Sequence, residues 1–268
     1  PQKIEIMQFN FKKEIPLILI TVIPAIFLWY VWNSLPPEVP LHWNISGEVD
    51  RYGSKNELIW LTTLVPIFLY VLFLLVPLID PKKKIAAMGG KFYTIRFYLT
   101  LFLSVLFTFI IYSVKEQTLT NPNYLFIIIG VFYVVLGNYF KTIKPNYFIG
   151  IRTPWALENE TIWKSTHRLA GKLWVAGGLL IIITCFLFKQ HTALTLFLII
   201  TAIITLIPVA HSYLQFKKIT TVLILLLTST SFFAQDNLNR PQTPQAPFSY
   251  NIEEVSFQNM QDSITLKG

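Results

Sequence analysis

The chain has 268 residues, of which 53% are hydrophobic and only 13% are charged, whereas an ordinary soluble domain carries about 25% charged residues. This deficit excludes an ordinary globular domain and predicts a polytopic membrane protein. The formal net charge of +8 does not indicate nucleic-acid binding, because the lysines and arginines cluster at the ends of apolar runs, where membrane topology requires them. The single cysteine, Cys185, excludes an intrachain disulfide and a metal site built from thiolates.

Six apolar runs approach or reach the length of about 20 residues that is needed to cross a bilayer. These runs cover residues 15–32, 58–79, 97–114, 124–140, 173–188 and 193–210. We therefore predict an all-α fold, a polytopic transmembrane helical bundle of six spans with a poorly structured C-terminal tail. No Asp, Glu, Lys, Arg or His lies deep within these runs. This disfavours a coupled transporter, because such proteins usually keep an ionisable group inside the membrane.

The basic residues predict the orientation of the bundle. They gather before the first run, between the second and third, between the fourth and fifth, and after the sixth: Lys12, Lys13, Lys82, Lys83, Lys84, Lys91, Arg96, Lys141, Lys144, Arg152, Lys164, Arg168, Lys172, Lys217 and Lys218. The alternate loops hold only Arg51, Lys55, Lys115 and Lys189. The positive-inside rule therefore places the N- and C-termini of the bundle and the two basic loops in the cytoplasm.

The first loop, residues 33–57, faces the outside in this topology. Pro40 biases the residue before it away from helix, so we expect residues 39–43 to be extended. Residues 44–47 are expected to form a turn, in which Gly47 is free to take a positive φ.

The same loop carries candidate chemistry. His42, Glu48 and Asp50 offer an imidazole and two carboxylates, which are ligands suited to a cation site. The alternative is an ordered loop cap, with the tryptophan of the extended piece at the headgroup level and Asp50 paired to Arg51 or Lys55.

The interval 144–172 is the longest polar, charged and aromatic-rich segment inside this apolar sequence. Residues 146–151 are too short to span the membrane and are expected to lie in its interface. Thr153 followed by Pro154 indicates a helix start, with Thr as the N-cap and Pro at the first helical position, where no donor is lost.

From about Glu160 the pattern becomes helical. Lys164, Arg168 and Lys172 fall on one face, and Trp163, His167 and Trp174 lie along another. This predicts an amphipathic helix on the inner membrane surface that runs into the fifth span. Two interpretations stay open: a docking surface for an acidic partner or a lipid headgroup, with His167 titrating near neutral pH, and a membrane anchor without a partner.

Both loops resemble motifs of one family. His42-Trp43-Asn44, followed by Gly47, Asp50 and Lys55, resembles the N-terminal module of the SdpI family of bacterial membrane immunity proteins. Asn146-Tyr147-Phe148-Ile149-Gly150-Ile151-Arg152-Thr153-Pro154-Trp155, followed by Trp163, Thr166-His167-Arg168 and Gly171, resembles its C-terminal signature. The resemblance covers roughly residues 11–214, and two motifs in the right order make it specific.

The resemblance implies a multi-pass protein of the bacterial inner membrane that protects against a secreted peptide toxin. In some members it implies signalling, by holding a transcriptional repressor at the membrane. A small-solute transporter and a membrane enzyme are the alternatives. We predict no enzymatic activity, because His42, Glu48 and Asp50 lie outside while His167 lies inside, so they cannot cooperate. No cofactor, metal site or direct nucleic-acid contact is assigned; the expected partners are the lipid bilayer, a toxin outside and a cytoplasmic regulator inside.

Two sets of candidate binding residues follow. The inner set, for a partner or a lipid, comprises Asn146, Tyr147, Gly150, Arg152, Thr153, Pro154, Trp155, Trp163, His167, Arg168 and Gly171. The outer set comprises His42, Trp43, Asn44, Gly47, Asp50 and Lys55.

The predicted segments are a leader (1–10), an N-terminal module (11–92), a C-terminal module (93–215), an apolar segment (216–235) and a polar tail (236–268). The leader begins with Pro1, and Met7 is a candidate start.

Two lysines, an apolar stretch and a small residue before Gln make residues 216–235 similar to a secretory signal peptide. We favour a signal peptide from an adjacent, joined reading frame over a seventh span. Residues 247–267 resemble the opening of a secreted α/β-hydrolase. No Gly-x-Ser-x-Gly turn occurs in the chain, so a hydrolase there would be only a stub.

Overall fold

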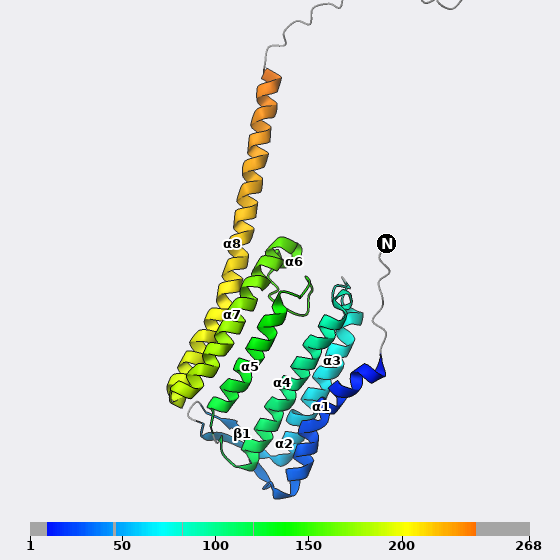
Figure 1. The fold of residues 1–268 in the computed structure, drawn as a ribbon, viewed down its shortest axis with the longest axis vertical. Helices are drawn as coiled ribbons and strands as arrows, with labels where there is room; N and C mark the ends of the chain where they lie inside the picture. The colour runs from blue at the N-terminus through cyan, green and yellow to red at the C-terminus, as the bar shows by residue number, and fades with distance from the viewer. Residues whose placement is uncertain (1–9, 45–46, 82, 120, 240–268) are drawn as a thin grey trace, which may run out of the picture. The chain divides into compact units, whose positions relative to one another are not determined.

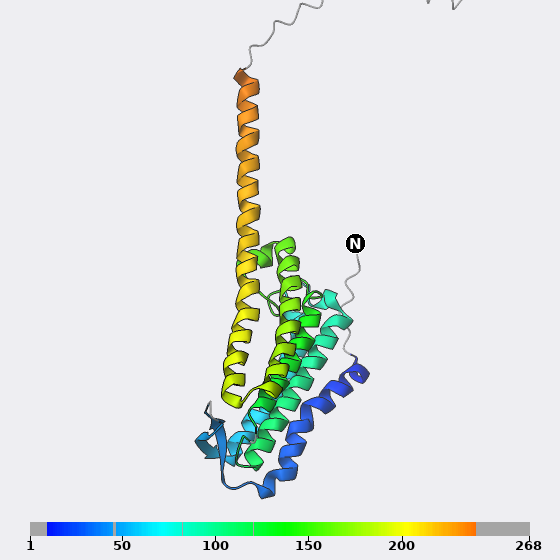
Figure 2. The ribbon, with the colours of Figure 1, turned by 60° about the vertical axis from the view of Figure 1, so that its left-hand side comes forward.

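The computed structural model describes residues 10–44, 47–81, 83–119 and 121–239, with the backbone alone over 229–239. The chain divides into two units, Pro1–Ile219 and Thr220–Gly268. The first unit holds the spans and both candidate loops, and Figures 1 and 2 show its helices packed side by side.

Among the described residues, six helical segments are long and apolar enough to cross a membrane. They are α1 (Phe11–Val31), α2 with α3 (Lys55–Ile59 and Val65–Ile79, joined by a π-helical turn over Trp60–Leu64), α4 (Gly90–Lys115), α5 (Asn123–Phe140), α7 (Glu160–Leu187) and α8 (Gln190–Asn239). At about 1.5 Å per residue, even α5 is about 27 Å long, close to the thickness of a bilayer core. The predicted six-span helical bundle is confirmed.

All six segments begin before the predicted apolar runs, and three of them do so by a full turn or more. α1 begins at Phe11 and α4 at Gly90, so both contain a turn or more of polar sequence before the apolar run. α7 begins at Glu160, where the Asn159 side chain caps two backbone N–H groups. The expected surface helix is therefore not a separate element but the first turns of the fifth span.

Glycines let α5 and α7 pack backbone against backbone. A Cβ added at Gly178 would lie 2.5 Å from the carbonyl oxygen of Gly130, and one at Gly171 would lie 2.7 Å from that of Gly137. The two glycines of α5, Gly130 and Gly137, are seven residues apart, and so are the two of α7, Gly171 and Gly178. Both contacts therefore fall on one stripe of each helix. Close approach through small residues is the usual way in which helices associate in lipid. Gly171, a member of the inner set, is thus a packing residue.

The outer end of the bundle carries a β-hairpin. Strand β1 (Glu38–Trp43) pairs antiparallel with β2 (Val49–Ser54), as the predicted extended piece and turn require. Gly47 takes φ +81° at the turn. Val39 of β1 is fully buried in an apolar cluster with Leu28 and Val31 of α1 and Ile111 and Val114 of α4. The hairpin is therefore fixed to the ends of two spans.

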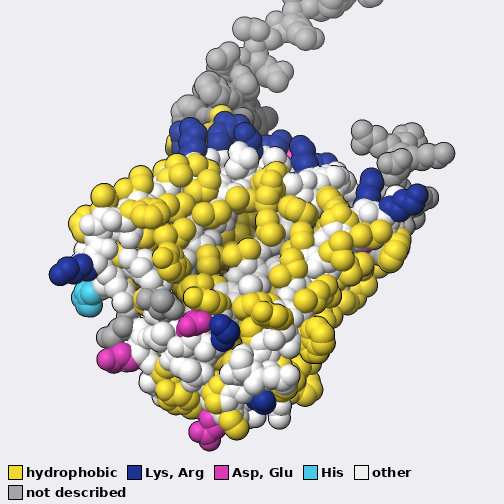
Figure 3. All heavy atoms as spheres, turned by 60° about the horizontal axis from the view of Figure 1, so that its bottom comes forward, with side chains coloured by type: hydrophobic (Ala, Val, Ile, Leu, Met, Phe, Trp, Pro, Cys, Tyr) yellow, Lys and Arg dark blue, Asp and Glu magenta, His cyan; other side chains and the backbone are white. Residues whose placement is uncertain are grey.

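Charge is distributed unequally between the two ends of the first unit. Figure 3 shows a row of lysine and arginine side chains along one rim, a broad hydrophobic surface below it, and acidic side chains together with a few basic ones near the other end. The segments at the basic end are those that the positive-inside rule places in the cytoplasm. The hairpin lies at the opposite end (Figure 1).

Helix α8 continues without a break through Asn239. The predicted segment 216–235 therefore lies within the bounds of α8. Residues 240–268, which contain the hydrolase-like sequence, and residues 1–9 of the leader lie outside the described residues.

Candidate functional site

The inner loop, residues 141–153, is folded around the side chain of Asn146. This side chain is fully buried. Its Oδ1 accepts hydrogen bonds from the backbone N–H groups of Phe148 and Ile149, both at 2.8 Å. Its Nδ2 donates to the carbonyl oxygens of Lys144 (2.7 Å) and Ile149 (3.1 Å). The Asn146 amide thus makes all four of its hydrogen bonds to backbone groups of an irregular loop. Asn146 is a positioning residue.

His167 joins this loop to α7. Its Nε2 accepts a hydrogen bond from the backbone N–H of Ile151 at 3.0 Å, and its Nδ1–H donates to the carbonyl oxygen of Trp163 at 2.9 Å. Because a carbonyl oxygen only accepts, the ring is the neutral tautomer with its proton on Nδ1. Gly150 reaches this place with φ +105°, and a Cβ there would lie 2.4 Å from Nε2. Only glycine fits here.

The aromatic face predicted for α7 exists, but it is covered by the loop. Trp163 and His167 are each 1% exposed, and their rings stack with centroids 4.0 Å apart. Trp163 Nε1 donates to the carbonyl oxygen of Ile143 at 2.7 Å. The expectation of an exposed His167 that titrates on the membrane surface is therefore wrong, because both ring nitrogens are buried and occupied.

A short helix, α6 (Pro154–Glu158), fastens the loop to α8. Pro154 occupies its start, as predicted, but Thr153 does not cap it with its side chain. The Thr153 hydroxyl instead lies 3.3 Å from Ser212 Oγ, and Trp155 Nε1 donates to the same oxygen at 2.8 Å. The Trp155 ring also stacks on Phe216, with centroids 5.9 Å apart. Ser212 was not among the predicted residues, since a lone serine just beyond the sixth apolar run gives no signal.

The exposed part of the inner loop is basic. The predicted face of Lys164, Arg168 and Lys172 is exposed, and Lys164 pairs with Glu160 at 2.9 Å. Arg152 is exposed and donates one guanidinium hydrogen bond to the carbonyl oxygen of Tyr147. Of the inner set, Tyr147, Arg152, Pro154 and Arg168 are exposed, so these are the side chains that a partner can reach most readily.

The outer hairpin does not assemble the three-residue cation site. His42 Nδ1 pairs with Asp50 across the two strands, whereas Glu48 accepts a hydrogen bond from Asn44 Nδ2 at 3.1 Å. Asn44 Oδ1 in turn accepts from the backbone N–H of Glu48 at 3.0 Å, closing the turn. Within the described segments, no group of three His, Cys, Asp or Glu side chains is placed to hold a metal ion.

The alternative pairing of Asp50 with Arg51 or Lys55 is also wrong. Arg51 pairs with Glu57 at 3.4 Å, and the Lys55 ammonium lies over the Trp32 ring, 4.6 Å from its centroid. Trp43 packs against the apolar cluster below the hairpin.

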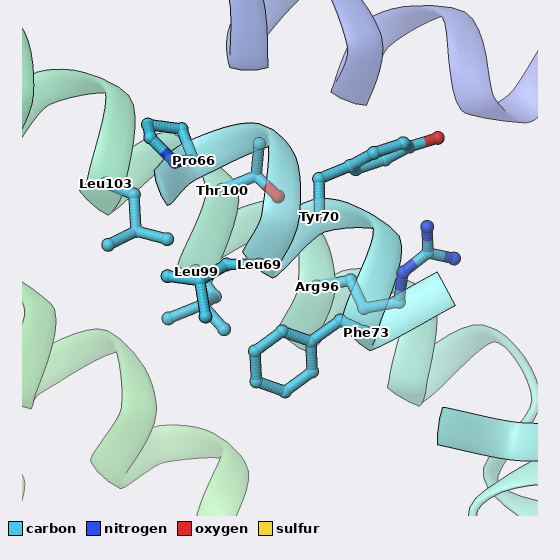
Figure 4. A pocket seen from close by; sticks show the side chains of 8 residues that line it. All are labelled: Pro66, Leu69, Tyr70, Phe73, Arg96, Leu99, Thr100 and Leu103. Carbon is cyan, nitrogen blue, oxygen red and sulfur yellow. The ribbon is translucent and has the colours of Figure 1, made fainter. Parts of the chain in front are cut away.

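Besides the inner loop and the outer hairpin, a third polar cluster lies inside the bundle at its basic end, and no sequence motif predicted it. The Arg96 guanidinium of α4 donates to both carboxylate oxygens of Glu14 in α1, at 3.0 and 2.7 Å. Tyr70 of α3 donates a third hydrogen bond to this carboxylate at 2.9 Å. Figure 4 shows Tyr70 and Arg96 beside a small cavity of about 10 Å³, roughly the room for one water molecule. Both residues lie just outside the apolar runs, near the starts of α1 and α4, so an ionisable pair is buried in the bundle although none lies deep within a run.

Comparison with known proteins gives the same assignment as the two loop motifs. A model of the SdpI/YfhL protein family matches residues 142–212, and a domain of unknown function, DUF1648, matches residues 19–66. The immunity protein SdpI of Bacillus subtilis (strain 168) is 26% identical over 210 residues, which are 78% of this chain and 98% of that protein. Residues 142–212 thus match the SdpI/YfhL family, and the chain is similar to an SdpI immunity protein along most of its length. No solved structure matches it.

The family match and the spans together define a multi-pass bacterial membrane protein. The SdpI/YfhL match over residues 142–212 contains the inner loop from its second residue onward, α6, α7 and Ser212, which accepts the hydrogen bond from Trp155. The match over residues 19–66 contains the outer hairpin. Both candidate loops therefore lie in the parts of the chain that carry the family resemblance.

Proposed function

We propose that this protein protects its cell against a secreted peptide toxin and relays the presence of that toxin to a cytoplasmic regulator. The observation that carries the proposal is the relationship to an immunity protein over 98% of that protein's length. A match of this extent covers most of the chain rather than one shared module. The relationship to an immunity protein also supports a role that is not enzymatic.

The outer hairpin is the surface proposed to meet the toxin. Asn44 and Gly47 shape its turn, and burial of Val39 fixes it to the bundle. The side chains of His42 and Asp50 stay accessible, at 66% and 43% relative exposure. A rigid hairpin with a few exposed polar groups loses little conformational entropy when it binds.

The inner loop is the surface proposed to hold the regulator. Arg152, Arg168 and Tyr147 face outward, so a partner with acidic side chains fits them. Their positions depend on the residues behind them: Asn146, Trp163, His167 and Gly171 are buried, and Gly150, Thr153 and Trp155 are partly buried, whereas Pro154 is exposed at the start of α6. The two surfaces lie at opposite ends of the bundle, as a relay across the membrane requires.

Toxin challenge tests the proposal. Cells with and without the chain are exposed to the secreted peptide fraction of the same bacterium, and survival is scored beside membrane recruitment of cytoplasmic proteins. Cells with the chain are expected to survive better. Arg152→Gln and Trp155→Ala are expected to abolish protection or recruitment, with membrane insertion intact, whereas Lys172→Gln, which removes an equal charge from an exposed position, is expected to retain both. Equal survival with and without the chain rejects the immunity role.

A small-solute transporter is the second candidate, favoured by the buried Glu14–Arg96 pair. Ionisable groups inside a membrane bundle often mark the paths of substrates and ions. Uptake of labelled solutes by proteoliposomes that contain the purified chain, set against empty liposomes, tests it. Uptake that Glu14→Gln abolishes would establish this role.

A further inference from the structure

A cleft opens between the inner loop and the spans beneath it. Its volume is about 760 Å³, within the range of about 300–1,000 Å³ that small-molecule sites occupy. Its walls come from α4, α5, α7, α8 and the loop, and include Leu136, Tyr139, Phe140, Ile149, Trp174 and Val209. The cleft is separate from the outer hairpin and from the buried ion pair, although two of its lining residues, Tyr147 and Arg152, also belong to the surface proposed for the regulator.

The walls of the cleft suit a hydrocarbon chain. Most of the lining side chains are aliphatic or aromatic. Polar groups among them are largely occupied within the protein: Trp174 Nε1 donates to the carbonyl oxygen of Ile204, and the Thr153 hydroxyl lies against Ser212. An apolar ligand would therefore enter without leaving these groups unpaired.

The charge at the cleft is of one sign. Among the described residues that line it, Arg152 is the one with a formal charge, and no carboxylate stands beside it. Its guanidinium is exposed and spends one N–H on the carbonyl oxygen of Tyr147, out of the five that an arginine has. An exposed, planar guanidinium is suited to bidentate contact with a phosphate.

The depth of the cleft places it at the inner leaflet. Its α5 wall, from Leu136 to Ile143, covers the end of the fourth span and the residues just beyond it, next to the basic residues Lys141 and Lys144. Basic pockets between helices on the cytoplasmic side are where anionic lipid headgroups bind. The apolar walls then lie at the level of the acyl chains.

We propose that this cleft binds one anionic phospholipid of the inner leaflet, with an acyl chain along α5 and its phosphate on Arg152. The bound lipid would complete the surface of the inner loop, because it occupies the space beneath Ile149 and Arg152. The site does not depend on the immunity role, and it is tested without a toxin or a regulator.

The test uses the purified full chain in nanodiscs that contain equal amounts of phosphatidylglycerol and phosphatidylcholine. Native mass spectrometry then counts the lipids that stay bound after gentle release. The wild-type chain is expected to retain phosphatidylglycerol over phosphatidylcholine by about fivefold, the factor that one basic residue at a membrane surface contributes. Arg152→Gln is expected to remove this preference while phosphatidylcholine retention stays unchanged, which shows that the cleft is intact. Arg152→Lys is expected to keep part of it.

Two further variants separate the site from general charge. Lys172→Gln removes a positive charge outside the cleft and is expected to keep the preference. Leu136→Trp fills the cleft and is expected to reduce retention of both lipids. Equal retention of the two lipids by the wild-type chain overturns the proposal. An Arg152→Gln chain that keeps the preference for phosphatidylglycerol also overturns the proposal and would leave Arg152 free for an acidic protein. A Lys172→Gln chain that loses this preference as fully as Arg152→Gln does would overturn it too.

Discussion

The buried pair of Glu14 and Arg96 connects the first span to the third. The two side chains are only 8% and 2% exposed, and both guanidinium–carboxylate hydrogen bonds have good lengths, 3.0 and 2.7 Å. Tyr70 adds a hydrogen bond from a third helix. Replacing one member of the pair therefore leaves a buried charge without its counter-ion, and the adjacent cavity has room for only about one water molecule.

Glu14→Gln is expected to lower the free energy of unfolding by about 3–5 kcal/mol, the usual cost of breaking a buried ion pair on one side. The double variant Glu14→Gln/Arg96→Met is expected to recover part of this loss, because no isolated charge remains. Tyr70→Phe removes one hydrogen bond to a charged group and is expected to cost about 1.5–3 kcal/mol.

The assay is reversible unfolding of the purified chain in mixed micelles, as the fraction of SDS rises, followed by tryptophan fluorescence. Lys172→Gln serves as the matched control, since an exposed charge is expected to change stability by less than about 0.5 kcal/mol. A Glu14→Gln chain as stable as the wild type would refute the reasoning. A double variant that is no more stable than the single variant would refute the part that assigns the loss to the unpaired charge.

Three further substitutions test the packing and the inner loop in the same assay. Gly178→Ala is expected to lower the free energy of unfolding by about 1–3 kcal/mol, because its Cβ would lie 2.5 Å from a carbonyl oxygen of α5. Gly90→Ala is the control and is expected to cost nothing, because a Cβ there meets nothing within 4 Å. Equal losses of stability in the two variants would contradict the proposed packing of α5 against α7. Gly150→Ala is expected to displace the loop, because of its φ of +105° and the nearness of His167; unchanged protease resistance of the loop would count against this. Asn146→Ala leaves buried backbone groups unpaired at about 1–3 kcal/mol each; a neutral result would show that water replaces the side chain.

The six spans and the outer hairpin were predictable because each depends on local sequence. The length of an apolar run decides whether a helix can cross the bilayer, and Pro40 and Gly47 impose an extended segment and a turn. The orientation rests on where lysines and arginines cluster, which is also a property of short segments.

The interior of the site was not predictable, because it depends on contacts between distant residues. Glu14 and Arg96 are 82 residues apart, and both fell outside runs whose ends were judged by hydropathy alone. A glutamate in the first turn of one span and an arginine just before another were the available signal. The helical pattern showed that Trp163 and His167 share a face, but not that the preceding loop folds over it.

Thiol labelling of spheroplasts tests most directly whether the hairpin and the inner loop lie on opposite sides of the membrane. The chain has one cysteine, so Cys185→Ser gives a clean background for single cysteines at two exposed positions, Tyr52 in β2 and Lys164 in α7. An impermeant maleimide is expected to label Tyr52→Cys in intact spheroplasts and Lys164→Cys only after permeabilisation. Labelling of both positions from the same side would contradict the arrangement on which the relay depends.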